Sequence, residues 1–270
     1  MLLRTIAALS FVLTVVLYFC LDTALWLIPV LFVLLYAGFL LLAFLLLWAL
    51  SAVVDASVPQ EHDSKGYRRI VMWYIEALIP LVGLKMDVSG LEKCPDTKRI
   101  MLVCNHQNEG DPGILMHYFK KYELSFVAKK EVQSMFIMGG LMHKLVCQPI
   151  NRENDREALK SILRCIQLLK TDEVSIGAFP EGGIFDKDKL HPFRSGVFKI
   201  AQKAKVPIVV CTMKGTSDLF HNMKRLKPTP VRLHLVDVID AEEVASTNTV
   251  ELGDKIYQMM LTDLGPEYAP

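Results

Sequence analysis

The residues of this chain whose types and spacing suit acid–base chemistry are a histidine and an aspartate in one loop. His106 follows an apolar run that ends at Cys104, and Asp111 stands before Pro112, where a helix is expected to begin. A loop that folds back between a strand and a helix brings such a carboxylate onto the imidazole, which then takes a proton from a substrate hydroxyl group. The alternative is that Asp111 only caps the helix and that His106 is an ordinary polar loop residue.

A second loop carries an arginine. Arg152 follows the apolar run that ends at Ile150. A guanidinium group in that place grips a phosphate through two parallel hydrogen bonds. A surface salt bridge with Glu153 or Asp155 is the ordinary alternative.

A third loop, Phe179-Pro180-Glu181-Gly182-Gly183, combines a carboxylate with two glycines. The glycines allow backbone N–H groups to approach a ligand closely, and Glu181 can accept hydrogen bonds from substrate hydroxyl groups. A plain turn is the alternative for this loop.

The elements that would position these loops alternate between strand and helix. Apolar runs predict strands at 99–104, 124–128, 145–150, 174–179, 207–213 and 231–238, and helices are predicted at 111–121, 132–144, 155–170, 196–203 and 250–261. This order is typical of an α/β fold with a largely parallel central sheet flanked by helices. In such sheets ligands bind beyond the carboxyl ends of the strands, where all three loops would lie.

The first 54 residues differ in composition from the rest. They hold only two charges, on Arg4 and Asp22, and two apolar runs, 6–19 and 24–54, on either side of Asp22-Thr23. Because a helix needs about 20 apolar residues to cross a bilayer core, the pattern predicts a membrane-embedded helical hairpin. Two full spans and a re-entrant hairpin both fit.

Charges beside the hairpin indicate its orientation. Arg4 precedes it, and Lys65, Arg68 and Arg69 follow it, so both ends carry the positive flank expected of the cytosolic side. A cleaved signal peptide is disfavoured, because small residues typical of a cleavage site are missing around Cys20. We therefore expect the chain at the cytosolic face of the cell membrane or of an internal membrane.

Three parts are expected along the chain: a membrane-anchoring hairpin at 1–54, a linker with an interfacial helix at 55–97, and an α/β catalytic domain at 98–270. In the linker, Trp73 and Tyr74 suit the headgroup region, and Arg68 and Arg69 suit anionic lipid. An ordinary core helix that ends near Pro80 fits the same segment.

Charge and cysteine content exclude some classes of function. Removing the two hairpin charges leaves 29 Lys+Arg and 28 Asp+Glu in residues 55–270, a balance that gives no support for nucleic-acid binding. The six cysteines form no CxxC pair and are too few for a disulfide framework. We expect reduced, mostly packed thiols.

Taken in order, these loops resemble the sequence blocks of the PlsC-like lysophospholipid acyltransferase family. The matching segments are Asn105-His106 with Asp111 for the His-x4-Asp block, Ile150-Asn151-Arg152, Phe179-Pro180-Glu181-Gly182, Phe193-Arg194-Ser195-Gly196 and Val206-Pro207-Ile208. The resemblance covers about residues 70–240.

The resemblance implies a role for each matching residue. His106 would deprotonate the acceptor hydroxyl group, and Asp111 would orient His106. Substrate binding would fall to Asn105, Arg152, Glu181, Gly182, Gly183 and Arg194. The family transfers the acyl group directly, so Cys104, at the end of an apolar strand, is expected to be a packing residue and not a nucleophile.

The implied reaction moves a fatty acyl group from acyl-CoA or acyl-carrier protein to the sn-2 hydroxyl of 1-acylglycerol-3-phosphate, which gives phosphatidic acid. The implied partners are the lysophospholipid, the acyl thioester and membrane lipid, with no cofactor and no metal. Two departures leave the acceptor headgroup open: Gly183-Ile184 stands where the family often has Thr-Arg, and Arg194 replaces the usual lysine.

Three other functions stay open. Another lysophospholipid or glycerol phosphate is a possible acceptor. A membrane-tethered lipid-binding protein without catalysis is the non-enzymatic alternative. A metal-dependent phosphoesterase is the second enzyme class, although the other histidines show no ligand-like spacing with carboxylates.

Overall fold

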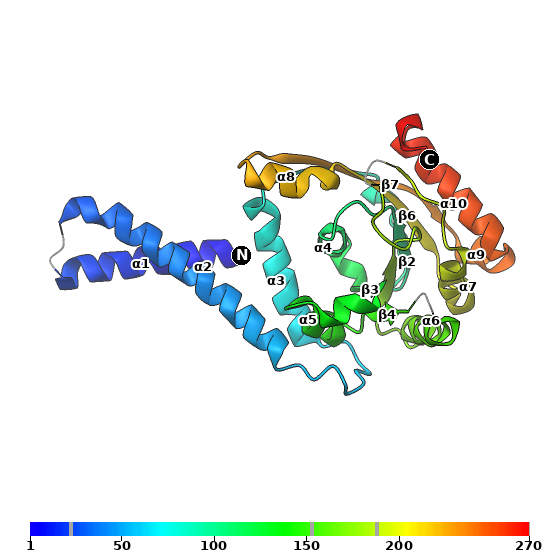
Figure 1. Ribbon diagram of the computed structural model, residues 1–270, viewed down its shortest axis with the longest axis horizontal. Helices are drawn as coiled ribbons and strands as arrows, with labels where there is room; N and C mark the ends of the chain where they lie inside the picture. Colours follow the sequence, from blue (N-terminus) through cyan, green and yellow to red (C-terminus); the bar gives the residue numbers. More distant parts are fainter. Residues whose placement is uncertain (22–23, 152–153, 187–188, 270) are drawn as a thin grey trace.

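The computed structural model describes residues 1–21, 24–151, 154–186 and 189–269. A pair of long helices projects from an α/β unit (Figure 1). The expected turn at Asp22-Thr23 and the candidate phosphate ligand Arg152 lie outside the described residues.

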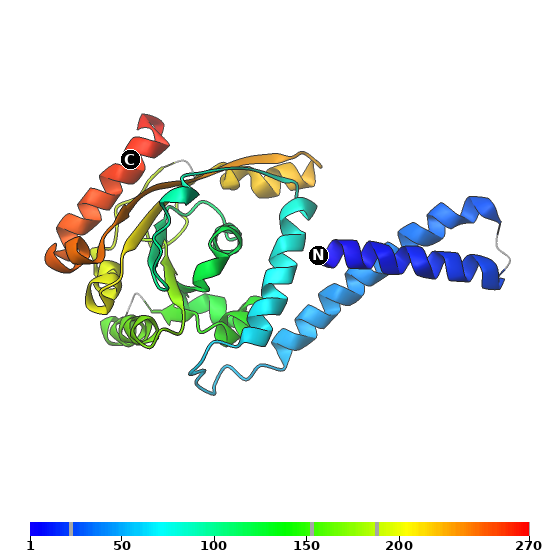
Figure 2. The same ribbon diagram turned by 180° about the vertical axis from the view of Figure 1, so that it is seen from behind.

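The projecting helices are α1 (Leu2–Leu21) and α2 (Ile28–Ala52), with a short 3-10 helix at Leu25–Leu27 between them. They pack against each other, and the two are seen from opposite sides in Figures 1 and 2. By length and composition both are able to cross a membrane. The predicted helical hairpin is therefore confirmed.

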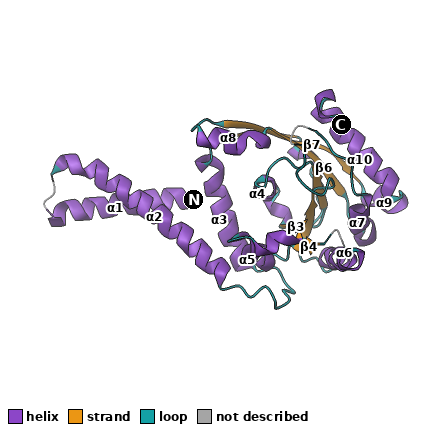
Figure 3. Ribbon diagram, in the orientation of Figure 1, coloured by secondary structure: helices purple, strands orange, loops and turns teal. Residues whose placement is uncertain are grey.

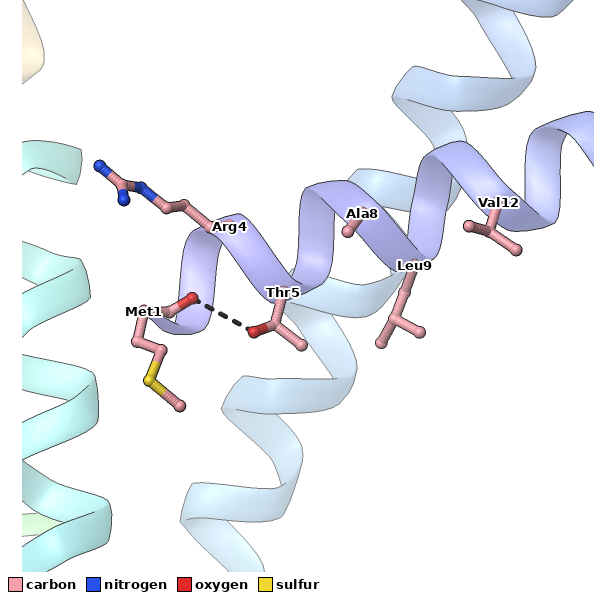
Figure 4. A pocket seen from close by; sticks show the side chains of 6 residues that line it. All are labelled: Met1, Arg4, Thr5, Ala8, Leu9 and Val12. Carbon is pink, nitrogen blue, oxygen red and sulfur yellow. Dashed lines mark hydrogen bonds between the residues drawn. The ribbon is translucent and has the colours of Figure 1, made fainter.

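Small hydroxyl residues form the buried stripe of α1. Ser10 and Thr14 are buried one turn apart, and each donates a hydrogen bond to the carbonyl four residues earlier, over 2.8 and 2.7 Å. Small polar side chains that satisfy themselves in this way let apolar helices approach closely. At the start of α1, Arg4 points away from Leu9 and Val12 beside a shallow surface depression (Figure 4).

Helix α3 (Lys65–Leu81) joins the hairpin to the α/β unit. The Tyr74 hydroxyl donates to the carbonyl of Ala43 in α2 over 2.7 Å. Of the two environments considered for Arg68, anionic lipid and an ordinary core helix, the structure shows the second. Its side chain is only 8% exposed and forms an ion pair of 2.7 Å with Asp63. Its guanidinium also donates to the carbonyl of Leu124, so this charge holds α3 against the sheet and does not face lipid.

Seven strands form one sheet in the order β1-β7-β6-β2-β5-β3-β4. Their bounds are β1 (Leu84–Ser89), β2 (Met101–Cys104), β3 (Leu124–Lys129), β4 (Gln148–Ile150), β5 (Ser175–Ala178), β6 (Ile208–Lys214) and β7 (Thr229–Ile239). All pairs are parallel except β6 with β7. The expected α/β fold with a mostly parallel sheet is confirmed.

Strand β1 was not predicted. It lies at the sheet edge and alternates between half-buried and exposed residues, so it lacks the continuous apolar run that marked the other strands. It pairs with β7 from Leu84 to Ser89. The sheet therefore begins within the segment 55–97 that we expected to be a linker.

Helices cover both faces of the sheet (Figure 3). They are α4 (Asp111–Tyr118), α5 (Met138–Lys144), α6 (Asp155–Lys170), α7 (Lys199–Ala204), α8 (Leu219–Lys224), α9 (Ala241–Ser246) and α10 (Thr249–Leu264). One core lies where α6, α7 and α10 meet the sheet, and the other where α3 and α4 meet it. The predicted helix 132–144 is wrong in its first half, because a 3-10 helix at Lys130–Ser134 and a left-handed Ile137 (φ 64°) precede α5.

Candidate active site

The first and third candidate loops leave neighbouring parallel strands. His106 lies two residues beyond the end of β2, and Phe179 directly follows β5. These strands pair in parallel, with Val103 beside Ala178. Their carboxyl ends therefore meet at one edge of the sheet, and the two loops contact each other there.

The aspartate folds back onto the histidine. His106 Nδ1 lies 3.0 Å from Asp111 Oδ2, and the same oxygen accepts the backbone N–H groups of Gln107 and Asn108, each over 2.8 Å. Asp111 is fully buried, whereas the His106 side chain is 16% exposed. Because three donors surround one carboxylate oxygen, the buried charge is stabilised and the imidazole is held by its Nδ1 side.

A phenylalanine ring lies along the face of the imidazole. The ring centroids of His106 and Phe179 are 4.0 Å apart with planes at 15°, and Phe179 stacks in turn on Phe126 at 5.7 Å. Gly177 leaves room for the Phe126 ring, since a Cβ at that glycine would lie 2.4 Å from it. Phe126 carries no functional signal in the sequence, because a phenylalanine inside a strand is typical of any core.

Glu181 ties two loops together. Its Oε1 accepts the backbone N–H of His106 over 2.8 Å, and its Oε2 accepts that of His191 over 3.0 Å. The carboxyl is almost fully buried, and this burial raises its pKa even though the two N–H donors oppose the rise. Both oxygens therefore hold the backbone around His106, and a contact with substrate stays a prediction.

The glycines after Glu181 form the turn itself. Gly182 has a left-handed φ of 84°, and its N–H donates to the carbonyl of Phe179 over 3.0 Å. Gly183 is buried behind it. A residue with a side chain would be strained at Gly182, so this turn needs glycine whether or not it contacts a substrate.

Asn105 has both ends of its amide engaged by one residue of β6. Its Nδ2 donates to the carbonyl of Met213 over 2.9 Å, and its Oδ1 accepts the N–H of Met213 over 2.7 Å. The side chain is buried. In this structure Asn105 fixes the start of the His106 loop to β6, and the predicted role in substrate binding is untested.

Arg194 is the exposed cation beside this site. Its backbone N–H donates to the carbonyl of Pro180 over 2.9 Å, which places it next to the Glu181 turn. Its guanidinium forms no hydrogen bond or ion pair with any residue that the structure describes. The guanidinium is therefore accessible to an anion, and its role as a substrate ligand stays a prediction.

Cys104 is packed in the core, as expected. Its thiol is fully buried, and burial raises its pKa well above the usual range. A protonated thiol is a poor nucleophile. Within the described ranges no group of three or more His, Cys, Asp or Glu side chains is arranged to hold a metal ion.

Comparisons with known proteins agree with these observations. Residues 85–214 match the family model described as Acyltransferase. A probable 1-acyl-sn-glycerol-3-phosphate acyltransferase of Mycoplasma pneumoniae is 28% identical over 71% of this chain and 74% of its own length. The alpha enzyme of that name from Mus musculus is 26% identical over 67% of this chain and 64% of its own length. For the chloroplastic BAT2 enzyme of Brassica napus, the match spans only 45% of the relative.

A solved structure shares the whole architecture. The crystal structure of the 1-acyl-sn-glycerophosphate acyltransferase PlsC from Thermotoga maritima aligns with a TM-score of 0.60 at 19% identity, over 96% of this chain and 93% of that chain. The likeness therefore includes the hairpin as well as the sheet. The chain is a PlsC-like acyltransferase homologue, related to the 1-acyl-sn-glycerol-3-phosphate acyltransferases.

Proposed function

We propose that this protein transfers a fatty acyl group from an acyl thioester to the sn-2 hydroxyl of 1-acylglycerol-3-phosphate, giving phosphatidic acid. The observation that carries the proposal is the contact of 3.0 Å between His106 Nδ1 and Asp111 Oδ2. This contact keeps the proton of the neutral imidazole on Nδ1, so that Nε2 has its lone pair free. No residue in the described part of the chain bonds to Nε2. The names of the relatives support the same substrate class.

The reaction uses His106 as general base and then as general acid. Nε2 takes the proton of the acceptor hydroxyl while the hydroxyl oxygen attacks the thioester carbonyl carbon. The tetrahedral intermediate collapses, the C–S bond breaks, and the departing sulfur takes the proton back from the imidazolium. Asp111 stabilises the imidazolium that forms between these steps.

Recognition of the acceptor falls to the cations at the site. Arg194 is exposed beside the Glu181 turn, and a guanidinium binds a phosphate monoester through paired hydrogen bonds. Arg152 is proposed as the second phosphate ligand, on its sequence position alone. Glycerol phosphate carries the same phosphate monoester, and other lysophospholipids carry a phosphodiester, so these are the alternative acceptors.

We further propose that residues 1–54 anchor the protein at the cytosolic face of a membrane. Residues 98–270 then form the catalytic domain together with β1, which lies in the segment 55–97 that we expected to be a linker. The apolar α1 and α2 support the anchor. Since the acceptor and the product both reside in the bilayer, an anchored enzyme avoids extracting them into water, which costs about 0.8 kcal/mol per methylene.

Release of free thiol tests the proposal. The full chain, purified in detergent, is given acyl-CoA or acyl-carrier protein donors with lysophosphatidate, glycerol phosphate or lysophosphatidylcholine. We expect fastest release with lysophosphatidate, near-complete loss in His106→Ala, and full activity in the control His62→Ala, whose side chain is exposed. Cys104→Ala retains turnover if the transfer is direct.

Each negative result has a distinct meaning. A preference for lysophosphatidylcholine refutes the proposed acceptor but leaves acyl transfer standing. Lipid binding without any His106-dependent thiol release favours the non-catalytic alternative. Release of phosphate from the lipid that is lost after chelation, without release of thiol, favours the metal-dependent phosphoesterase.

A further inference from the structure

Helix α8 and the four residues after it form a short basic and apolar tip. Leu226 is 95% exposed and has a left-handed φ of 54°, and Phe220 and Met223 are also exposed on the same short segment. Large apolar side chains that are exposed together on a monomer mark an interaction surface. We call residues 219–228 the α8 tip.

The α8 tip is also strongly cationic. Lys224, Arg225 and Lys227 are all exposed. No acidic residue occurs between Asp218 and Asp237 in the sequence. The tip therefore presents positive charge interleaved with apolar side chains.

The α8 tip lies next to the end of α3. The N–H of Thr229 donates to the carbonyl of Gly83 over 2.8 Å, which places the residue after the tip directly beside the residues that follow α3. Leu78 and Leu81, in the last turn of α3, are exposed as well. Figures 1 and 2 show this corner on the side of the α/β unit from which the hairpin projects.

We propose that the α8 tip is a second membrane contact, at which Phe220, Met223 and Leu226 enter the boundary of an anionic bilayer while the neighbouring cations pair with lipid phosphates. The inference rests on the membrane association in the proposed function. Apolar and basic side chains on one short surface segment are the combination that binds anionic interfaces. Continuity with the hairpin side and the unbroken positive charge favour lipid over a second protein.

A second contact changes what the anchor does. The hairpin alone attaches the α/β unit to the bilayer at one place, through α2 and its contacts with α3 and α5. Attachment at the α8 tip as well holds the unit in one orientation against the bilayer. The sheet edge that carries His106 is then kept at a constant height above the lipid.

Depth of a fluorescent label tests the contact directly. Leu226→Cys is introduced into the full chain with Cys20→Ser, labelled with an environment-sensitive dye, and reconstituted into vesicles of phosphatidylcholine and phosphatidylglycerol. The matched control is Leu163→Cys, an exposed leucine on α6, on the side away from the hairpin. We expect a blue shift and quenching by acyl-chain nitroxide lipid at position 226 only, and weaker effects in pure phosphatidylcholine.

Three outcomes overturn the inference. The labels at 226 and 163 would give equal emission in anionic vesicles if the tip stays in water. A shift at 226 in detergent that grows with protein concentration would assign the surface to a second copy of the chain. A shift that appears only after a soluble cell fraction is added would assign it to another protein.

A charge-reversal variant tests whether the membrane contact at the α8 tip affects turnover. Replacing all three tip cations, by Lys224→Glu, Arg225→Glu and Lys227→Glu, removes a membrane attraction worth roughly fivefold in partition for each basic side chain. We expect turnover at limiting acceptor to fall at least fivefold in anionic vesicles and to stay unchanged on a short-chain acceptor in detergent. The control set is Lys170→Glu, Lys203→Glu and Lys205→Glu, three lysines exposed on other helices and their ends.

The two readouts separate this inference from the proposed function. Equal loss in vesicles and in detergent would show damage to the fold, and no loss in vesicles would overturn the membrane contact. A chain without turnover in any medium refutes the proposed acyl transfer, while the label comparison at 226 and 163 still decides the contact.

Discussion

The imidazole ring of His106 lies flat against the phenyl ring of Phe179, with centroids 4.0 Å apart and planes at 15°. Asp111 holds the same imidazole in its plane through Nδ1. One contact acts on the face of the ring and the other on a nitrogen at its edge, so together they restrain both the position and the tilt of the ring. The Phe-Pro-Glu-Gly block thus supports the histidine in two ways. Phe179 contacts the imidazole ring, and Glu181 accepts the backbone N–H of His106.

Phe179→Leu is expected to lower kcat about tenfold and to leave KM nearly unchanged. Leucine fills the space but offers no flat face, so the imidazole gains freedom to tilt, and small misplacements of a reacting group cost large factors in rate. Steady-state kinetics with lysophosphatidate measures the split. The control is Phe185→Leu, an exposed phenylalanine of the same loop. An unchanged kcat in Phe179→Leu would show that Asp111 alone positions the ring.

Gly177→Ala is expected to disturb the stacked rings of His106, Phe179 and Phe126 by displacing Phe126. The added Cβ would lie 2.4 Å from the Phe126 ring, so that ring must move, and its stacking on Phe179 changes. Overpacking of a core costs about 1–3 kcal/mol, which thermal unfolding would register together with a fall in kcat. Adding Phe126→Leu should restore stability but not the full rate. Gly66→Ala, where the added Cβ meets open space, serves as control.

How far the sequence predicts this site can be judged from particular residues. His106 and Asp111 were paired correctly because a histidine after a strand and an aspartate before a helix are both local signals. Asn105 was assigned to substrate, whereas its amide bonds to Met213, 108 residues away. No local pattern reveals that contact, since it depends on β2 and β6 lying side by side.

Helices and strands also divide into those that local sequence signals predict and those that depend on distant contacts. Helix α6 runs from Asp155 to Lys170 as predicted, because it is amphipathic and Asn154 caps it by accepting the N–H groups of Arg156 and Glu157. Strand β1 was missed because only its register with β7 makes it a strand. Long-range pairing decides such edge segments, and propensity does not.

Asp111→Asn is expected to reduce kcat by about a hundredfold to ten-thousandfold while KM changes little. The amide keeps the size of the carboxylate but loses the charge that stabilises the imidazolium. One oxygen accepts three donors here, and the other has no partner among the described side chains, so an Nδ2 in its place would be buried without an acceptor. Asp87→Asn, on the exposed sheet edge, is the control. Retention of wild-type kcat would contradict the role proposed for the carboxylate.

We expect Glu181 to contribute to the free energy of unfolding in a way that decreases as pH rises. Burial raises the pKa of its carboxyl in the folded state, so the folded chain binds the proton more tightly than the unfolded chain does. By linkage, this contribution is fully present below the unfolded pKa and is lost as pH rises through the folded pKa. Glu181→Gln cannot titrate and lacks the dependence.

The measurement is the free energy of unfolding by urea for both chains between about pH 4 and pH 8, a range that brackets an elevated carboxyl pKa. The wild-type value minus the Glu181→Gln value should decrease with pH. Titration of groups that do not interact with Glu181 is common to both chains and cancels in this difference. A difference that increases with pH would contradict the direction of the pKa shift.

The stability of the protein should depend strongly on both charges of the buried ion pair between Arg68 and Asp63, which holds α3 against the sheet. The guanidinium bonds to both oxygens of Asp63 over 2.8 and 2.7 Å and also reaches the carbonyl of Leu124. Removing one partner of a buried pair leaves the other uncompensated and costs about 3–5 kcal/mol. We therefore expect Asp63→Ala and Arg68→Ala each to lower the thermal midpoint markedly.

The double variant tests whether the single variants lose stability because one charge is left buried without its partner. Replacing both partners, by Asp63→Leu and Arg68→Met, leaves no lone buried charge, so its stability should exceed that of either single variant. The double variant should still be less stable than the wild type. It lacks the hydrogen bonds that Arg68 donates to the carbonyl of Leu124 and the hydroxyl of Ser125 in β3. Lys65→Ala, at the exposed start of α3, should change the midpoint little. If the double variant were less stable than both single variants, the charges would stabilise the junction by more than their desolvation costs.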